Sequence, residues 1–195
     1  MDIVQETYLR KKLRCSMPSI LSVSRSRLHD FSKANEDHLV LVENYGVEGD
    51  AHAGETVKHR SRVAVDPSQP NLRQVHLLHH ELLASLADKG FDLKAGDLGE
   101  NILTSGIDLL GLPTDTVLAI GADVKLRVTG LRNPCAQIES FRTGLLQEVV
   151  TRGADGNLVR KAGIMSVVVA GGIVKPGDEI RAILPDLPHL PLERV

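Results

Sequence analysis

Short apolar runs separated by glycine-rich turns are the feature that most restricts the fold of this chain. Runs of about four to eight apolar or alternating residues predict β-strands. They lie at residues 20–23, 39–42, 117–120, 124–129, 163–170 and 179–184. Helical spacing is clear at residues 79–89, before Gly90, and weaker at 141–150, where Gly144 interrupts it. Several short strands with two inserted helices favour a mainly β fold, a closed or nearly closed β-barrel, over a parallel α/β sheet.

Length and composition favour one domain and limit the classes of partner. The chain has 195 residues with a net charge of -2 and 3% aromatic residues, which argues against a nucleic-acid partner. We expect a polar N-terminal extension at residues 1–17, a domain at 18–185 and a Pro-rich tail at 186–195. Cys15 and Cys135 are too few for a disulfide framework, and no stretch looks like a secretion signal or membrane span. We therefore expect a cytoplasmic protein with no membrane partner.

Cys135 is the better placed of the two cysteines. It follows the predicted strand 124–129 on a loop that Gly130 should turn and Pro134 should stiffen. Arg132 lies three residues away and would favour the thiolate, the form that attacks, binds metals and carries sulfur. The alternative is that Cys135 is a small buried hydrophobic residue.

The loop at residues 46–54 carries Asp50 and His52 among three glycines. A carboxylate so close to an imidazole can orient it, as in many catalytic and metal sites. The loop matches neither nucleotide-binding glycine pattern. Alternatively, Asp50 caps backbone donors of a turn and His52 faces water.

Positive charge is concentrated at residues 56–62, where Lys58, Arg60 and Arg62 occur together. A compact cationic loop without aromatic neighbours suits a small phosphate-bearing ligand better than a nucleic acid. A solvated loop is the alternative explanation.

Two further polar segments have both a functional and a structural interpretation. His76 and His80 have the spacing of zinc ligands on one helix face, but the pattern favours a strand end and a helix start. The turn at residues 96–101 brings Asp97, Glu100 and Asn101 to the start of a strand. These side chains could line a site or satisfy the backbone of a tight turn.

Four motifs together resemble the MOSC family, the domain named after the C-terminal part of molybdenum cofactor sulfurases. They are Gly49-Asp50-Ala51-His52, Gly96-Asp97-Leu98-Gly99-Glu100-Asn101-Ile102, Leu131-Arg132-Asn133-Pro134-Cys135, and Gly163-Ile164-Met165 through Gly177-Asp178. The resemblance extends over about residues 20–184 and is closest to stand-alone bacterial, YiiM-like members.

The resemblance implies a β-barrel fold and a role for Cys135 as a persulfide carrier or as the ligand of molybdenum in the pterin cofactor. In the reductase branch, the bound cofactor reduces N-hydroxylated substrates. A soft thiolate suits both roles. The cations expected to bind the cofactor's phosphate are Lys58, Arg60, Arg62, Arg73 and Arg132. The residues expected to donate or accept hydrogen bonds to pterin or substrate are Asp50, His52 and Asn101.

The implied chemistry requires partners. The chain has no room for a pyridoxal-phosphate domain, so a separate desulfurase would supply sulfur to a carrier. Two cysteines cannot hold an iron–sulfur cluster, so a reductase would need a separate electron donor. A third, weaker alternative is a cysteine hydrolase that pairs Cys135 with His52 or His76.

Overall fold

The fold is described from a computed structural model that covers residues 17–58, 63–154 and 156–195. The strands are β1 (Ser19–Arg25), β2 (Ala34–Glu36), β3 (Leu39–Val42), β4 (Gly46–Val47), β5 (Val75–His79), β6 (Ile102–Ser105), β7 (Val117–Ile120), β8 (Val124–Leu131), β9 (Val150–Arg152), β10 (Leu158–Arg160), β11 (Ile164–Ala170), β12 (Gly172–Val174) and β13 (Ile180–Ile183). The helices are α3 (His80–Ala87), α4 (Ala136–Phe141) and α5 (Leu145–Val149). The expected mainly β class is therefore confirmed.

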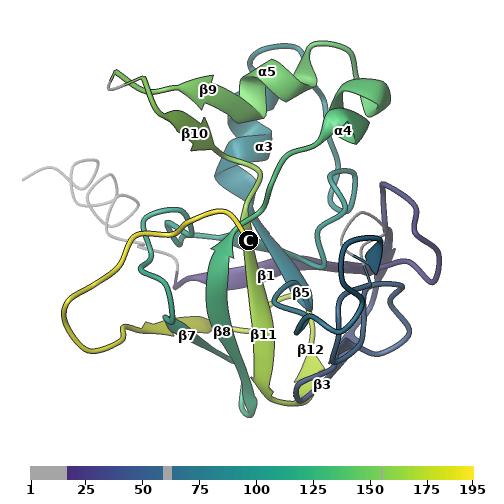
Figure 1. Ribbon diagram of the computed structural model, residues 1–195, viewed down its shortest axis with the longest axis vertical. Coiled ribbons are helices and arrows are strands. Elements are labelled where there is room, and N and C mark those ends of the chain that lie inside the picture. Colours follow the sequence, from purple (N-terminus) through teal and green to yellow (C-terminus); the bar gives the residue numbers. More distant parts are fainter. Residues whose placement is uncertain (1–16, 59–62, 155) are drawn as a thin grey trace, which may run out of the picture.

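One eight-stranded sheet organises the molecule, with the strand order β13-β7-β8-β11-β5-β6-β1-β2. Its neighbouring strands are antiparallel except β5 and β6, which are parallel because α3 crosses over between them. The strands β12, β3 and β4 form a second sheet, and β9 pairs with β10. Figure 1 shows the helices and the β9–β10 hairpin together above one end of the main sheet.

The closed barrel that the sequence predicted is not confirmed. Within the described residues the main sheet has two edges, β13 and β2, and no sheet closes on itself. The start of β1 does reach the start of β13, because Ile20 N donates to Asp178 O at 2.9 Å and Ile180 N donates to Pro18 O at 2.7 Å. Only an isolated bridge between Ser19 and Glu179 forms there, since β1 continues toward its partners β6 and β2. The sheet is curled without a continuous seam.

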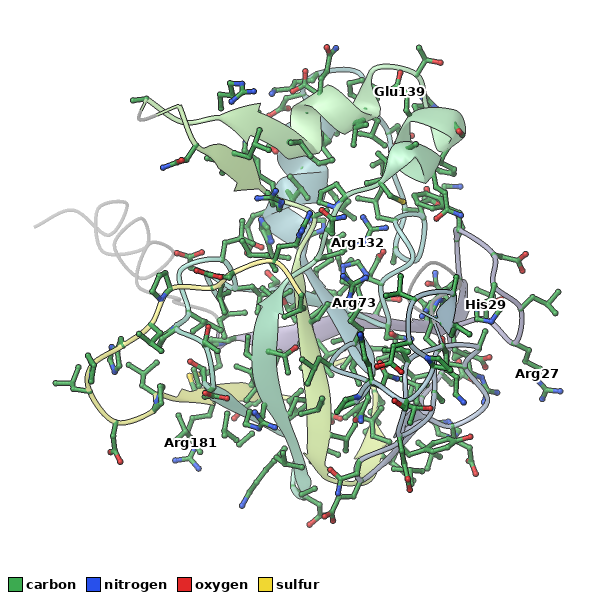
Figure 2. All side chains as sticks on the ribbon, viewed as in Figure 1. Arg27, His29, Arg73, Arg132, Glu139 and Arg181 are labelled. Atoms are coloured by element: carbon green, nitrogen blue, oxygen red, sulfur yellow. The ribbon has the colours of Figure 1, made fainter. Side chains whose placement is uncertain are left out.

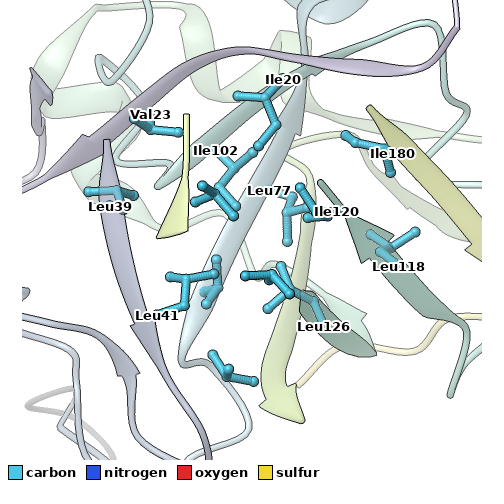
Figure 3. Packing of buried hydrophobic residues seen from close by; sticks show 14 of the residues in the cluster. Ile20, Val23, Leu39, Leu41, Leu77, Ile102, Leu118, Ile120, Leu126 and Ile180 are labelled. Carbon is cyan, nitrogen blue, oxygen red and sulfur yellow. The ribbon is translucent and has the colours of Figure 1, made fainter. Parts of the chain in front are cut away.

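Two hydrophobic clusters lie on the two sides of this arrangement. The larger fills the interior of the curled sheet, where side chains such as Ile20, Leu77 and Leu126 point toward one another from different strands (Figure 3). The smaller cluster packs α3 and α5 against the ends of β5 and β6, through Leu78, Leu83 and neighbouring side chains. Burying both sets of apolar area is what holds the helical layer on the sheet.

Some predicted segments have the expected bounds, and others differ. Residues 39–42 and 117–120 form β3 and β7 as predicted. The predicted helix at 141–150 is instead divided, because Gly144 has a φ of 84° and separates α4 from α5. No helix in the described ranges is long and apolar enough to cross a membrane.

Candidate functional site

A cavity of about 660 Å³ lies where loops from the sheet meet loops from the helical layer. Seven residues singled out in the sequence line it: Cys135, His52, Lys58, Arg73, His76, Asn101 and Arg132. Figure 2 shows Arg73 and Arg132 near each other at the centre of the molecule, with His29 further along the same region. Asp50 lies behind the cavity wall, and Arg60 and Arg62 fall outside the described residues.

Cys135 sits on the segment that leads from β8 to α4. The predicted turn at Gly130 is wrong, because β8 continues through Gly130 to Leu131 before the chain leaves the sheet. Arg132 N then donates to Gly163 O at 3.0 Å, which fixes the start of the loop against the start of β11. The thiol of Cys135 is partly exposed, and its Sγ lies 3.4 Å from Gln137 Oε1. The sulfur is therefore not sealed in the core.

Asp50 is the centre of a buried network behind one wall of the cavity, and its partners Lys33, His52 and Asn101 line that wall. Its side chain is 1% exposed and accepts hydrogen bonds from Lys33 Nζ at 2.7 Å and from the backbone N of His52 at 2.9 Å. The His52 Nδ1 lies 3.3 Å from Asp50 Oδ1. The sequence-based interpretation that Asp50 orients the imidazole agrees with this geometry.

Electrostatics support an ion pair between Asp50 and Lys33. Burial would raise the pKa of Asp50, but the hydrogen bond from His52 and the charge of Lys33 outweigh it and hold that pKa below its usual range. Burial lowers the pKa of Lys33, although Asp50 opposes the shift. The pair fixes this wall with its charges compensated.

Asn101 joins the network to the sheet. Its Nδ2 donates to Ser24 O at 3.1 Å and to Asp50 Oδ2 at 3.0 Å, and its Oδ1 accepts from His76 N at 3.1 Å. Both amide hydrogens are thus already donated within the protein. Asn101 consequently holds the wall in place rather than offering a donor to a ligand.

A second part of the cavity wall, formed by Arg132 with Glu100 outside the lining, contains polar atoms without partners. Arg132 Nη1 and Glu100 Oε2 are both buried, and neither has a hydrogen-bond partner among the described residues. Burial lowers the pKa of Arg132, against the opposing charges of Cys135 and Glu100. Burial raises the pKa of Glu100, whose Oε1 accepts from Gly96 N at 2.6 Å. A buried guanidinium nitrogen without a partner is costly unless a ligand or water satisfies it.

His76 has a structural role in this arrangement. Its Nε2 donates to Ala162 O at 2.8 Å, and burial, followed by the charge of Arg132, lowers the pKa of His76 to about 3. His76 lies in β5 and His80 begins α3, so they do not share a helix face as zinc ligands would. In the part of the chain that the structure describes, no three His, Cys, Asp or Glu side chains form a metal cluster. The hydrolase alternative also loses one of its two candidate bases.

The structure adds residues that sequence reasoning missed. Lys33 and Asn71 line the cavity, as do His29, whose ring meets that of His52 edge-on at 5.0 Å, and Arg194 from the C-terminal tail. Asn71 Nδ2 donates to His52 O at 2.8 Å and to Gly54 O at 3.0 Å, so it shapes the loop that carries His52. None of these residues stands in a motif, and only the fold brings them to the cavity.

Comparison with known families decides the affiliation of the chain. The profile of the MOSC domain matches residues 48–181, which is more than half of the sequence and includes Cys135. The chain belongs to the MOSC domain family. The family expected from the sequence motifs is thereby confirmed.

Solved structures of other proteins share this MOSC fold. YuaD from Bacillus subtilis superposes with a TM-score of 0.69 at 24% identity, over 87% of this chain and 98% of that one. YiiM from Geobacillus stearothermophilus gives 0.64 at 14% identity, over 89% of this chain and 79% of that one. YiiM from Escherichia coli gives 0.59 at 17% identity, over 88% and 73%. A comparison with curated protein sequences gives no match.

Proposed function

We propose that this MOSC protein binds the molybdenum cofactor in the cavity, with Cys135 as the protein ligand of the metal, and reduces N-hydroxylated compounds there. The observation that carries the proposal is that a partly exposed thiol and several cationic side chains open into one cavity. Its volume of about 660 Å³ is in the usual range for small-molecule sites. Family membership favours the same class of cofactor.

The residues present fit a phosphorylated pterin cofactor. Arg132 Nη1 is buried without a hydrogen-bond partner in the described structure, which an anionic oxygen would supply. Lys58 and Arg73 line the same cavity and would share the phosphate charge, and Arg60 and Arg62 remain candidates from the sequence. The soft sulfur of Cys135 is the ligand type suited to molybdenum.

The chain's own groups would position the substrate and move protons. When bound, the cofactor supplies the two electrons that, with two protons, convert N–OH to N–H and water. With His52 Nδ1 turned to Asp50, we assign proton transfer to the second ring nitrogen, Nε2. Asp50 would stabilise the imidazolium that forms when that nitrogen takes up a proton. A separate protein would return electrons to the site.

Metal and pterin analysis tests the proposal. The full chain is purified from a host that makes the cofactor, as wild type, Cys135→Ala and the control Cys15→Ser. We expect molybdenum and pterin in wild type and in the control, and molybdenum reduced by about tenfold or more in Cys135→Ala, because the assigned ligand is gone. Molybdenum occupancy that survives Cys135→Ala would defeat the assignment.

The exposure of Cys135 also favours a second candidate, a sulfur carrier that holds a persulfide on this residue. Cys135 is partly exposed and lines the cavity, which would make it accessible to a pyridoxal-phosphate-dependent desulfurase. Incubation with a desulfurase and cysteine, followed by mass spectrometry, should add one sulfur atom to wild type and none to Cys135→Ala. An unmodified Cys135 excludes the carrier, and a persulfide without reductase turnover excludes the reductase.

A further inference from the structure

The C-terminal tail returns to the cavity after the last strand of the sheet. In Figure 1 the yellow segment leaves β13, passes along one side of the molecule and ends beside the top of β8. Leu131 N donates to Glu193 O at 2.7 Å, and Val195 N donates to Leu131 O at 3.3 Å. Arg194 consequently forms a parallel bridge with Leu131, the residue that precedes Arg132.

Several independent contacts seat this tail. Thr114 N donates to Leu190 O at 2.9 Å, and Thr114 Oγ1 donates to Pro191 O at 3.1 Å. The side chain of Leu192 packs against the larger hydrophobic cluster. Backbone bonds on both sides of Arg194 and an apolar anchor before it fix the place where its side chain begins.

Gly130 is required for the tail to lie this close to β8. A Cβ at residue 130 would lie 2.4 Å from Glu193 O and 2.7 Å from Val195 Cγ1, far inside normal contact distance. Gly130 therefore allows the close approach of the tail and does not make a turn. The lack of a side chain at Gly130, just before the cysteine loop, leaves the space that the tail occupies.

The excess of cationic side chains in the cavity favours an anionic ligand near Arg132 and Arg194. Five Lys or Arg side chains line the cavity, whereas Asp30 is its single carboxylate among the described residues, in a protein whose net charge is -2. Lys33 is neutralised by Asp50, but Arg132 Nη1 has no hydrogen-bond partner in the described structure. An oxyanion between Arg132 and Arg194 would satisfy that nitrogen.

We propose that Arg194 is a ligand-binding residue, which with Arg132 holds a tetrahedral oxyanion such as a phosphate monoester. Arg132 meets the anion from the buried side, and the exposed Arg194 closes the site from the solvent side. Guanidinium groups suit this task because each can donate two parallel hydrogen bonds to phosphate oxygens. This inference takes the cavity from the proposed function and adds the tail as a part of its binding site.

Phosphate binding by the full chain tests the role of Arg194. Inorganic phosphate and pyrophosphate are titrated calorimetrically into wild type, Arg194→Gln and the control Arg181→Gln, which removes an exposed cation of β13 away from the cavity (Figure 2). We expect Arg194→Gln to weaken binding by about tenfold, the usual effect of losing one charged hydrogen bond. We expect Arg181→Gln to bind within about twofold of wild type, because a distant exposed charge is screened.

A second variant tests the tail without removing a charge. Gly130→Val should displace residues 193–195 and weaken phosphate binding about as much as Arg194→Gln. Binding by Arg194→Gln within about twofold of wild type, or equal losses in Arg194→Gln and Arg181→Gln, overturns the inference.

Cofactor loading separates this inference from the proposed function. If the anion is the cofactor's phosphate, cofactor-loaded protein should no longer bind inorganic phosphate; if it is a substrate group, loaded protein should still bind it. Arg194-dependent phosphate binding in a protein that never loads molybdenum or pterin supports the inference and rejects the proposed function. Cofactor-loaded protein whose phosphate binding is unchanged by Arg194→Gln supports the proposed function and rejects the inference about Arg194.

Discussion

The two walls of the cavity differ in how their buried charges are compensated. On one wall Asp50 and Lys33 form a pair whose side chains are 1% and 5% exposed, and Asn101 and His52 complete the hydrogen bonds of the carboxylate. On the Arg132 wall, Arg132 Nη1 and Oε2 of Glu100, which does not line the cavity, are buried without partners among the described residues. Each group contains a carboxylate and a cation, but among the described residues only Asp50 and Lys33 form a hydrogen-bonded ion pair.

This difference in hydrogen bonding suits the two walls to different roles, one that positions side chains and one that binds a ligand. A compensated pair has little to gain from a ligand, so its free energy holds the loop of His52 in one geometry. Arg132 Nη1, which has no hydrogen-bond partner in the described structure, gains one when an anion binds, and this offsets part of the cost of burying it. We infer that the Asp50 wall orients the reacting groups and that the Arg132 wall supplies affinity.

The largest expected effect is that of Asp50→Asn, which would break the compensated wall. The change leaves the Lys33 ammonium buried without its counter-charge, and removing one partner of such a pair typically costs about 3–5 kcal/mol. We expect the free energy of unfolding in urea at pH 7 to fall by that amount. Because the pKa of Asp50 lies below its unfolded value of 3.8, the difference should shrink as pH falls below about 4.

Asp115→Asn is the matched control for that change. Asp115 pairs with Arg127 at 2.8 Å, but the side chains are 56% and 43% exposed, so the loss should stay below about 1 kcal/mol. Asp115 has a φ of 66°, which asparagine also tolerates. Equal losses in the two variants would show that burial does not distinguish the Asp50 pair.

A smaller effect is expected from His76, which lines the cavity. The unfolded chain takes up a proton at this histidine near pH 6.5, whereas the folded protein does so only near its pKa of about 3. Stability should therefore fall by about 1.4 kcal/mol per pH unit as pH decreases below 6.5. His76→Gln, which can still donate to Ala162 O, should reduce this slope between about pH 6 and pH 4.5 and leave the part that comes from His79, whose pKa burial also lowers.

His80→Gln is the control, because His80 is exposed at the start of α3. It should leave the pH dependence of unfolding as it is in wild type. A slope in His76→Gln as steep as that of wild type would assign the pH dependence to other groups.

The sequence predicted the parts of this molecule that local patterns determine. Alternation over residues 124–129 and the uninterrupted apolar run 39–42 identified β8 and β3, because a strand with a buried face needs that pattern. Cys135 and the Asp50–His52 loop were identified because their residue types carry chemistry at short spacing. Closure of the barrel was not confirmed, since edge pairing depends on strand paths that periodicity does not encode.

The rest of the site depends on contacts between distant segments. Lys33 pairs with Asp50 across 17 positions, and Asn101 does so across 51. Arg194 reaches the cavity only because the tail docks beside Leu131. The apparent turn signal of Gly130 was in fact a packing requirement of that tail, which no local rule distinguishes.

The smallest effect is expected from Glu100→Gln, which makes on the uncompensated wall the same chemical change as Asp50→Asn. Gln can keep the acceptor for Gly96 N, and the wild-type carboxyl has its pKa raised by burial, so its ionisation costs stability above pH 4.5. We expect Glu100→Gln to change the free energy of unfolding by less than about 1 kcal/mol at pH 5 and to leave it equal or higher at pH 8. Phosphate binding should strengthen, because a negative charge near Arg132 is removed. A loss as large as that of Asp50→Asn would mean that Glu100 already compensates Arg132, and the two walls would then be alike.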